Sequence, residues 1–333
     1  MRKIAVLGAG SWGTTLAILL YGNGHSVRLW EFYPERVREL QSSHENPLFL
    51  PGVTIPQKIA ITDNLNEALD GIGMVVFALP SHVLRGLARK AAAQLTDRVI
   101  SVNVAKGLEK GTLKRMSQVL QEELPANTPI ATLSGPSHAE EVSRGIPTAV
   151  VVASPHEDLN CQVQETFMSA HFRVYTNEDI VGVELAGSVK NVIAIAAGIC
   201  DGLGYGDNTK GALLTRGLAE ISRLGTAMGA RSQTFAGLSG MGDLVTTCMS
   251  KYSRNRYVGE QIGGGKKLHQ VLSTMNMVAE GVNTTLAARL LARAKGVEMP
   301  ITEQVYQVLF ADKDPREAVQ DLMHRVAKAE IWW

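Results

Sequence analysis

The chain has 333 residues, of which 45% are hydrophobic and 20% are charged, and its formal net charge at pH 7 is +1. A length and composition of this kind are typical of a soluble globular protein with about two domains. The near-zero net charge provides no basic field for nucleic acid or for an anionic membrane surface, so we expect neither as a partner.

The cysteines and histidines exclude two kinds of site. Cys161, Cys200 and Cys248 are widely spaced and odd in number, which suits a reducing compartment and argues against a disulfide framework or a cysteine zinc site. The eight histidines form no H-x-x-x-H or similar pair, so we expect no metal. Glycines interrupt the N-terminal apolar run too early for a signal peptide, and no uninterrupted apolar run approaches the roughly 18 residues of a membrane span. These features predict a cytoplasmic protein without integral membrane association.

Residues 1–178 alternate short β-rich runs with helix-like stretches. This alternation predicts an α/β domain with a parallel, doubly wound sheet. The runs are nearly continuous in apolar residues, as expected for strands covered on both faces. The predicted strands are residues 3–8, 26–32, 58–63, 74–80, 98–105, 129–135, 148–154 and 172–176.

The β-rich runs end near residues 176–180, and long stretches with a 3.6-residue period follow. We therefore predict a nucleotide-binding domain over 1–178 and an all-helical C-terminal domain over 179–333. The predicted helices of the second domain are residues 179–203, 209–229, 254–263, 282–295 and 301–310.

A glycine cluster follows the first predicted strand directly and opens a predicted helix. It reads G-x-G-x-x-G, with Gly8, Gly10 and Gly13 as its glycines. The first permits a tight turn, the second lets the backbone approach a pyrophosphate, and the third lets helix and strand pack closely. This pattern predicts a Rossmann-like fold that binds a dinucleotide. A plain turn between strand and helix is the alternative.

The end of the second predicted strand carries Glu31, Phe32 and Tyr33. Glu31 lies 23 residues after Gly8, where an acidic side chain binds a ribose 2′-hydroxyl and repels a 2′-phosphate. A solvated glutamate at a strand end explains the sequence equally well. Phe32 is either a platform for adenine or an apolar residue at the rim. The choice between NAD and NADP therefore stays open.

Two further segments follow strand ends. Lys106 comes after the fifth predicted strand, and ligands of open α/β sheets bind beyond the carboxyl ends of strands. The alternative interpretation is that Lys106 is a solvated lysine in a loop. The segment 134–142 places Ser134 and Ser137 in a glycine-proline turn, which either presents backbone N–H groups or only changes the chain direction.

Lys190 stands in the most apolar predicted helix of the chain. Positions 183, 186, 187, 190, 194 and 197 share one helix face and read Val, Ala, Gly, Lys, Ala and Ala. Burial of an unpaired ammonium is costly, so we expect a partner or a shifted pKa, and the small side chains leave room for a ligand to approach. The alternative is a lysine whose stem packs on the apolar face while its amine reaches solvent.

Other polar residues of the second domain are suited to anion binding. Ser253, Arg254 and Asn255 stand at a predicted helix start, and an arginine beside hydroxyl and amide donors is what a phosphate prefers. A solvated loop is the alternative for this string. Asp243 and Glu280 are further polar candidates.

Six motifs in order over almost the whole chain resemble the NAD(P)-dependent glycerol-3-phosphate dehydrogenases, and the bacterial branch that serves phospholipid synthesis fits best. The motifs are GAGSWGTTLA, AKGLE, GPSHAEEV, ELAGSVKNVIAIAAGICDGLGYGDNTKGALLTRGL, GLSGMGDLVTTC and SRNR. The resemblance implies the reversible reduction of dihydroxyacetone phosphate to sn-glycerol 3-phosphate by NADH or NADPH, and it implies a homodimer.

The resemblance also implies roles for individual residues. Lys190 corresponds to the catalytic acid/base, which gives a proton to the alkoxide formed by hydride transfer. The implied substrate contacts are Lys106, Gly135, Ser137, Lys190, Asp243, Ser253, Arg254 and Asn255. The implied cofactor contacts, with the glycine cluster, are Gly8, Gly10, Ser11, Trp12, Gly13, Phe32, Tyr33, Lys106, Ala139, Arg254, Val278 and Glu280.

Two places in the sequence depart from the family pattern, one residue and one three-residue segment. His138 stands where relatives more usually carry phenylalanine, and Glu31-Phe32-Tyr33 replaces the small and basic residues common in bacterial members. Two other functions are considered. One is a β-hydroxyacid or 6-phosphogluconate type dehydrogenase, which also places a lysine on a first long C-terminal helix, and the other is a non-catalytic dinucleotide sensor.

Overall fold

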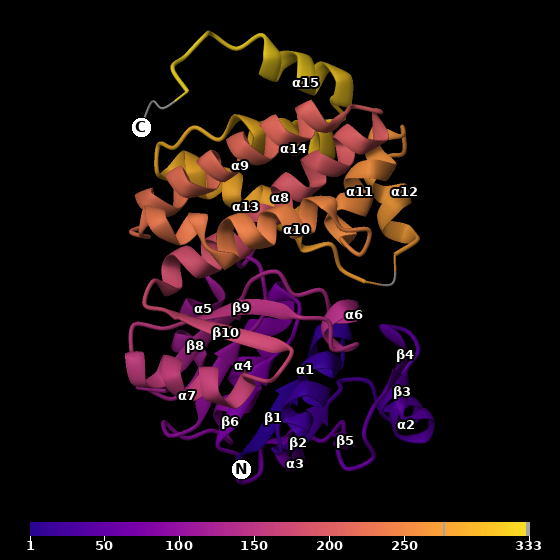
Figure 1. Cartoon of the computed structure of the whole chain (residues 1–333), viewed down its shortest axis with the longest axis vertical. Helices are drawn as coiled ribbons and strands as arrows, with labels where there is room; N and C mark the ends of the chain where they lie inside the picture. Colours follow the sequence, from indigo (N-terminus) through magenta and orange to yellow (C-terminus); the bar gives the residue numbers. More distant parts are fainter. Residues whose placement is uncertain (276, 331–333) are drawn as a thin grey trace. The chain divides into compact units, whose positions relative to one another are not determined.

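The computed structural model describes residues 1–275 and 277–330, and contacts divide the chain into two compact units (Figure 1). Unit 1 comprises Met1–Lys106 and Lys114–Ile180. Unit 2 comprises Gly107–Leu113 and the chain from Val181 onward.

Unit 1 is built on one eight-stranded sheet with the strand order β10-β9-β8-β7-β6-β1-β2-β5. Each strand overlaps one of the eight predicted runs. The α/β fold class is thereby confirmed. The strands are β1 (Lys3–Leu7), β2 (Ser26–Trp30), β5 (Ala60–Thr62), β6 (Met74–Phe77), β7 (Ile100–Asn103), β8 (Ile130–Ser134), β9 (Thr148–Ala153) and β10 (Phe172–Asn177).

Helices cover both faces of this sheet, and alternate residues of β1 show why. Ile4 and Val6 belong to one apolar cluster, whereas Ala5 and Leu7 belong to another. Side chains of a strand point to opposite faces in turn, so a strand buried on both sides must be apolar throughout. The helices of unit 1 are α1 (Ser11–Gly22), α2 (Pro34–Ser43), α3 (Leu65–Leu69), α4 (Ser81–Ala92), α5 (Met116–Glu123), α6 (Ala139–Val142) and α7 (Glu157–Phe167).

The strand order reverses at β1, which pairs with β2 on one side and with β6 on the other, both in parallel. Open α/β sheets bind ligands at such a reversal, beyond the carboxyl ends of the strands. The turn that follows β1 is the predicted glycine cluster. The topology therefore places this cluster where a dinucleotide binds in folds of this kind.

The predicted parallel sheet has one antiparallel pair, near one edge. β9 pairs antiparallel with β8 and parallel with β10, so these last two strands oppose the other six. A parallel neighbour requires a crossover, usually through a helix. The connection between β8 and β9 contains only the four-residue α6, and the chain turns back instead.

A small hairpin of β3 (Glu45–Asn46) and β4 (Leu50–Thr54) was not predicted. β3 has two residues and β4 contains Pro51 and Gly52, both depleted in strands. The sequence therefore carries little strand signal here.

Unit 2 consists of helices, as predicted. Five of them match the predicted long stretches, while α10, α12, α15 and two short turns do not stand out in the sequence because each is brief. The helices are α8 (Ile180–Gly202), α9 (Asp207–Ala227), α10 (Asp243–Met249), α11 (Arg254–Gly263), α12 (Leu268–Ser273), α13 (Glu280–Ala294), α14 (Pro300–Phe310) and α15 (Pro315–Met323), with a 3-10 turn at Ser232–Ala236 and a π turn at Leu238–Gly242.

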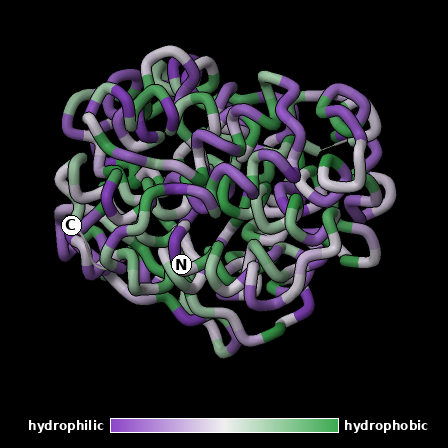
Figure 2. The backbone as a smooth tube through the Cα atoms, turned by 90° about the horizontal axis from the view of Figure 1, so that it is seen from above, coloured by the Kyte–Doolittle hydropathy of each residue, from purple (hydrophilic) through white to green (hydrophobic). Residues whose placement is uncertain are grey.

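α8 supplies the largest share of the described apolar core of unit 2. Its length and mean hydropathy of 1.6 also suit a membrane span, but 89% of its apolar window is buried inside the protein. In Figure 2, green and purple stretches alternate over a few residues along most of the chain, as amphipathic helices require. The burial of α8 identifies it as a core helix.

Glycines bring α8 and α11 into backbone contact. A Cβ at Gly198 or Gly202 would overlap the backbone of α11, and a Cβ at Gly259 or Gly263 would overlap the backbone of α8. The two helices approach this closely because neither carries a side chain at the contact. The contact fixes the first residues of α11 beside α8.

Candidate active site

The glycine-rich turn of unit 1 has the features that a dinucleotide requires. Gly8 has φ of 109°, and a Cβ there would lie 2.5 Å from the carbonyl oxygen of Ala78. A Cβ at Gly13 would overlap the Gly8 carbonyl, whereas a Cβ at Gly10 would have no described atom within 4 Å. Packing therefore explains the first and third glycines but not the second. The open space at Gly10 fits the close approach of a pyrophosphate.

Helix α1 begins directly at this turn. Its N-cap, Gly10, contributes no side-chain hydrogen bond, so the first N–H groups of the helix have no cap from that residue. Such a helix start attracts anions. Ser11 and Trp12 form its first positions, and the ring of Trp12 packs against Phe172 with 6.3 Å between centroids. The predicted contacts at Ser11 and Trp12 thus lie on a helix start that suits a phosphate.

The residues after β2 combine two exposed aromatic rings with a buried carboxylate. Phe32 is 58% exposed and Tyr33 is 52% exposed, and their rings meet edge to face at 5.0 Å. Glu31 is only 7% exposed, and its Oε1 accepts a hydrogen bond of 3.2 Å from the N–H of Tyr33. The interpretation of Glu31 as a solvated strand-end residue is therefore wrong.

The structure brings together three of the predicted residues at the ends of β7 and β8. Lys106 donates from Nζ to the carbonyl oxygen of Gly135 at 2.8 Å, and Ser137 donates from its hydroxyl to the same oxygen at 3.0 Å. Gly135 has φ of 132°, a conformation that favours glycine, and its Cβ would lie 3.0 Å from Val150. Lys106 is therefore a bonded residue of the turn, not a solvated loop lysine.

Ala139 and His138 complete this turn. Ala139 is buried and opens α6, with His138 as the N-cap residue. The Thr15 hydroxyl of α1 lies 3.4 Å from the carbonyl oxygen of Ala139. The predicted cofactor contact at Ala139 is thus joined to the helix that follows the glycine cluster.

In unit 2, Lys190 is 5% exposed and has two partners on α10. Its Nζ forms an ion pair of 2.9 Å with Asp243 Oδ1 and donates a hydrogen bond to the hydroxyl of Thr247. The Thr247 hydroxyl in turn donates to Asp243 Oδ1 at 3.1 Å. Each of the three groups contacts the other two. The alternative in which the amine reaches solvent is therefore wrong, and the expected partner is present.

The small residues that share the helix face of Lys190 serve helix packing. Ala186, Ala194 and Ala197 are fully buried in the apolar core of unit 2. Their small side chains let neighbouring helices approach α8 closely. The expectation that this face admits a ligand finds no support in these positions, because protein already covers them.

Local structure explains why Asp243 and Thr247 face the same amine. They lie four residues apart on α10, so they share one helix face. The preceding π turn is packed tightly, since a Cβ at Gly240 would overlap the backbone of Phe235. This turn sets the direction in which α10 starts.

The thiol next to this set is not a competing proton donor. Burial raises the pKa of Cys248 to about 12, and burial likewise raises the pKa of Cys200 to about 11. Both therefore remain neutral thiols near pH 7. Among the described residues, no group of three or more His, Cys, Asp or Glu is arranged to hold a metal ion. Lys190 is the charged donor of this cluster.

The start of α11 gathers the next predicted residues. Ser253 is the N-cap and accepts a hydrogen bond of 3.2 Å from the N–H of Arg256. The amide of Asn255 donates to Asn191 Oδ1 at 3.0 Å and accepts from the N–H of Gly281 at 2.9 Å. Asn255 thus ties α11 to α8 and to α13. Its amide nitrogen carries two hydrogens, so one remains for a ligand.

Arg254 brings the predicted cofactor contacts of unit 2 together. It is exposed and donates from Nη1 to the carbonyl oxygen of Val278 at 2.9 Å. Glu280 opens α13 two residues later. Arg254, Val278 and Glu280 therefore lie at one place, where α11 and α13 both begin.

Sequence reasoning missed Thr247 and the ion pairs of Asp201. The i+4 spacing of Thr247 from Asp243 could have indicated that both side chains lie on one helix face. Asp201 pairs with Arg256 at 2.6 Å and with Lys210 at 2.5 Å, which anchors α11 to α8 and α9. Nothing in the local sequence distinguishes this pairing from solvated charges.

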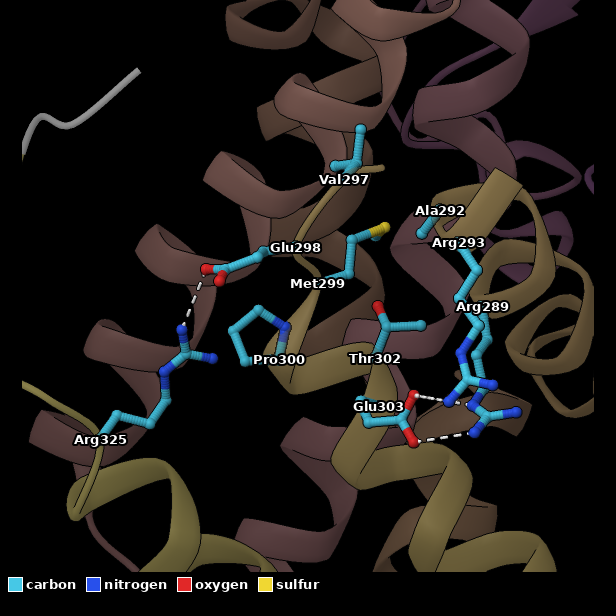
Figure 3. Close-up of a pocket in the computed structure, with 10 residues that line it drawn as sticks. All are labelled: Arg289, Ala292, Arg293, Val297, Glu298, Met299, Pro300, Thr302, Glu303 and Arg325. Carbon is cyan, nitrogen blue, oxygen red and sulfur yellow. Dashed lines mark hydrogen bonds and ion pairs between the residues drawn. The ribbon is translucent and has the colours of Figure 1, made fainter. Parts of the chain in front are cut away.

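A cavity of about 240 Å³ lies elsewhere in unit 2, where α13 leads into α14 (Figure 3). Glu303 closes one side of it by binding Arg289 at 2.7 and 3.0 Å, and Glu298 closes another by binding Arg325 at 3.2 Å. None of the predicted site residues lines it. Its lining is Arg289, Ala292, Arg293, Val297, Glu298, Met299, Pro300, Thr302, Glu303 and Arg325.

Two family models match the chain. That of the NAD-dependent glycerol-3-phosphate dehydrogenase N-terminus matches residues 3–160, and that of the corresponding C-terminus matches residues 179–320. A glycerol-3-phosphate dehydrogenase [NAD(P)+] of Chlorobium phaeobacteroides is 58% identical over 332 residues, covering 99% of each chain. One of Geobacillus thermodenitrificans is 53% identical, covering 99% of this chain and 97% of its own.

Solved structures give the same result. The glycerol-3-phosphate dehydrogenase of Coxiella burnetii has a TM-score of 0.93 at 38% identity, covering 97% of this chain and 99% of its own. A ketopantoate reductase of Ralstonia eutropha, with a TM-score of 0.60 and 14% identity over 97% of this chain and all of its own, shares the fold alone.

Proposed function

The chain belongs to the NAD-dependent glycerol-3-phosphate dehydrogenase family, and on this premise we propose which of its residues carry out the reaction. The reaction is the reversible reduction of dihydroxyacetone phosphate to sn-glycerol 3-phosphate with NADH or NADPH. The same membership argues against the hydroxyacid dehydrogenase and the non-catalytic sensor that were considered as alternatives.

The cofactor supplies the hydride when it is bound. The turn from Gly8 to Gly13 and the first N–H groups of α1 would hold its pyrophosphate. Phe32 and Tyr33 would offer apolar faces to its adenine, since both rings are exposed. Lys106 and Ala139 in unit 1, and Arg254, Val278 and Glu280 in unit 2, are the further cofactor contacts that we propose.

Lys190 supplies the proton. Hydride addition to a ketone leaves an alkoxide, and a charged ammonium both stabilises that oxygen and donates to it. Asp243 favours the charged form of the amine at 2.9 Å, and Thr247 accepts a second hydrogen bond. The two α10 side chains thus aim the proton donor.

The substrate phosphate would bind at the start of α11. Arg254 supplies a guanidinium, Asn255 supplies its remaining amide hydrogen, and the N-terminus of a ten-residue helix favours an anion. Ser253 already caps this helix through its hydroxyl. Lys106, Gly135 and Ser137 are the substrate contacts that we propose in unit 1.

The observation that carries the assignment is the buried set of Lys190, Asp243 and Thr247. Lys190→Ala should lower kcat by about 10²-fold or more, because it removes both a general acid and a charge at the oxyanion. The Kd for NADH, measured without substrate, should change by less than about threefold if the amine acts on the ketone rather than the cofactor.

Lys266→Ala is the matched control, since this lysine is exposed on the turn after α11. It should retain the wild-type kcat. Near-normal kcat in Lys190→Ala would remove Lys190 from the catalytic role.

We also propose a homodimer that works in the cytoplasm and serves glycerophospholipid synthesis. Exposed apolar side chains at Leu290 on α13 and Phe310 on α14 support a contact between subunits in unit 2. The family membership supports the cytoplasmic and biosynthetic setting.

A further inference from the structure

The end of β2 is hydrogen-bonded to the glycine-rich turn, and Glu31 is the next residue. The carbonyl oxygen of Trp30 accepts the N–H of Gly8 at 2.9 Å, and the N–H of Glu31 donates to Thr62 at 3.0 Å. Glu31 therefore extends the pairing of β2 with β5 by one residue. In doubly wound sheets, the adenosine ribose of a dinucleotide lies at this point.

The carboxylate of Glu31 is fixed in place. Oε1 accepts the N–H of Tyr33 at 3.2 Å, and Oε2 lies 3.7 Å from Nε of Arg36. The side chain is 9% exposed, so its remaining accessible acceptor sites face a restricted space. A fixed carboxylate is an acceptor for ribose hydroxyls and a source of repulsion for a phosphate.

Arg36 is the one cationic residue in the segment 31–36, and its guanidinium already makes other contacts. Its Nη2 donates to Asn46 Oδ1 at 3.0 Å, and its guanidinium lies over the ring of Phe49 at 4.4 Å from the centroid. Asn46 donates in turn to the carbonyl oxygen of Ala9 at 2.8 Å. To reach a 2′-phosphate, Arg36 would have to leave a network that supports the glycine-rich turn itself.

We propose that Glu31 makes this enzyme select NADH over NADPH. Its carboxylate accepts a hydrogen bond from the adenosine ribose 2′-hydroxyl and repels a phosphate at the same position. The inference rests on the proposed binding of a dinucleotide at the Gly8–Gly13 turn and adds a choice between the two cofactors, all within unit 1.

The test measures equilibrium binding of NADH and of NADPH to the full chain in the absence of dihydroxyacetone phosphate. The fluorescence of the cofactor monitors the binding. The wild-type Kd for NADPH should exceed that for NADH by at least about tenfold, as expected for two like charges brought within a few ångströms. Binding is read without turnover. A failure of the catalytic assignment, which appears as NADH binding without ketone reduction, is therefore distinct from a failure of this inference.

Two variants test whether the charge of Glu31 causes the difference between the two Kd values. Glu31→Gln keeps the shape and removes the charge, so the ratio of the two Kd values should fall about fivefold or more. Glu35→Gln removes the same charge from an exposed position four residues later and should leave the ratio within about twofold, because exposed charges are screened.

Arg36→Met tests the opposite assignment, in which this arginine binds the 2′-phosphate. On our proposal, this variant does not weaken NADPH binding relative to NADH. The inference is overturned if the wild type binds NADPH as tightly as NADH, if Glu31→Gln leaves the ratio unchanged, or if Arg36→Met weakens NADPH selectively.

Discussion

Lys190 combines burial with one charged and one polar partner on α10. Burial disfavours a charged amine, and Asp243 offsets this with an opposite charge at 2.9 Å. Thr247 contacts both ends of the pair. The hydroxyl therefore helps to fix the direction of the amine, while Asp243 supplies the opposite charge.

Thr247→Val keeps the shape of this side chain and removes the hydroxyl. We expect kcat to fall about tenfold, since a buried donor that loses its acceptor costs about 1–3 kcal/mol and the amine loses its direction. The Kd for NADH should stay unchanged. Steady-state rates with dihydroxyacetone phosphate check this.

Thr246→Val is the matched control, because it makes the same change one residue earlier on α10. Equal losses of kcat in the two variants would show that Thr247 acts through helix stability and not through Lys190.

Arg254→Ala should separate phosphorylated from unphosphorylated substrate. Arg254 is exposed and bonded to the carbonyl of Val278, so it can bind a phosphate without unfolding its helix. We expect KM for dihydroxyacetone phosphate to rise about 10- to 100-fold, as for loss of a charge-assisted hydrogen bond.

Dihydroxyacetone, which lacks the phosphate, is the internal control. At saturating NADH, where a weaker cofactor contact no longer limits the rate, its kcat/KM should differ little between wild type and Arg254→Ala. An unchanged KM for the phosphorylated ketone would exclude Arg254 from the phosphate site.

Between elements, buried polar contacts define how the helices of unit 2 meet. Glycines let α8 and α11 touch through their backbones, which places Asn255 within reach of Asn191. At the other side of the unit, Glu220 of α9 accepts the N–H groups of Ile301 at 2.6 Å and Thr302 at 3.2 Å. A side chain from one helix thus caps the start of another, α14.

Burial raises the pKa of Glu220 from 4.5 to about 7, while the hydrogen bonds from Ile301 and Thr302 oppose the rise. Between these two pH values the folded chain keeps a proton that the unfolded chain releases. The folded state then binds more protons, so the free energy of unfolding should fall as pH rises from about 4.5 to 7. The full shift corresponds to about 3 kcal/mol.

Glu220→Gln imitates the neutral acid and should remove this part of the pH dependence. Urea unfolding at several pH values between 4.5 and 7 measures it. Glu317→Gln, at an exposed position of α15, should keep the wild-type slope. An identical slope in Glu220→Gln would show that Glu220 ionises normally in the folded chain.

At the scale of the whole molecule, each of the two units holds one of the proposed functional features. Unit 1 holds the glycine-rich turn at the reversal of its sheet, and unit 2 holds the buried lysine on its central helix. Hydrophobic residues of α8 that would suit a membrane span are instead buried in unit 2. Its apolar sequence therefore serves the core of a folded unit.

The proposed homodimer predicts a mass in solution of twice the 35.9 kDa of the chain. Light scattering after size exclusion measures it. Because Leu290 is exposed on α13, Leu290→Glu should shift the mass toward the monomer, whereas Val326→Glu, at another exposed apolar residue beyond α15, should not. A monomer mass for the wild type at all concentrations would contradict the proposal.

The sequence by itself determined the eight strands of the sheet, the long helices of unit 2 and the glycine-rich turn. These features depend on local periodicity and on the steric freedom of glycine, both of which are written in neighbouring residues. It also indicated that Lys190 needs a partner, because a single cation interrupts an apolar helix face.

Only the tertiary structure decided which residues became partners. Thr247 lies 57 positions from Lys190, and Asn255 lies 64 from Asn191. The burial of Glu31 and the reversed direction of β9 likewise depend on segments that pack from elsewhere in the chain. A local pattern records which face of an element is apolar, but the identity of the neighbour is set by the packing of remote elements.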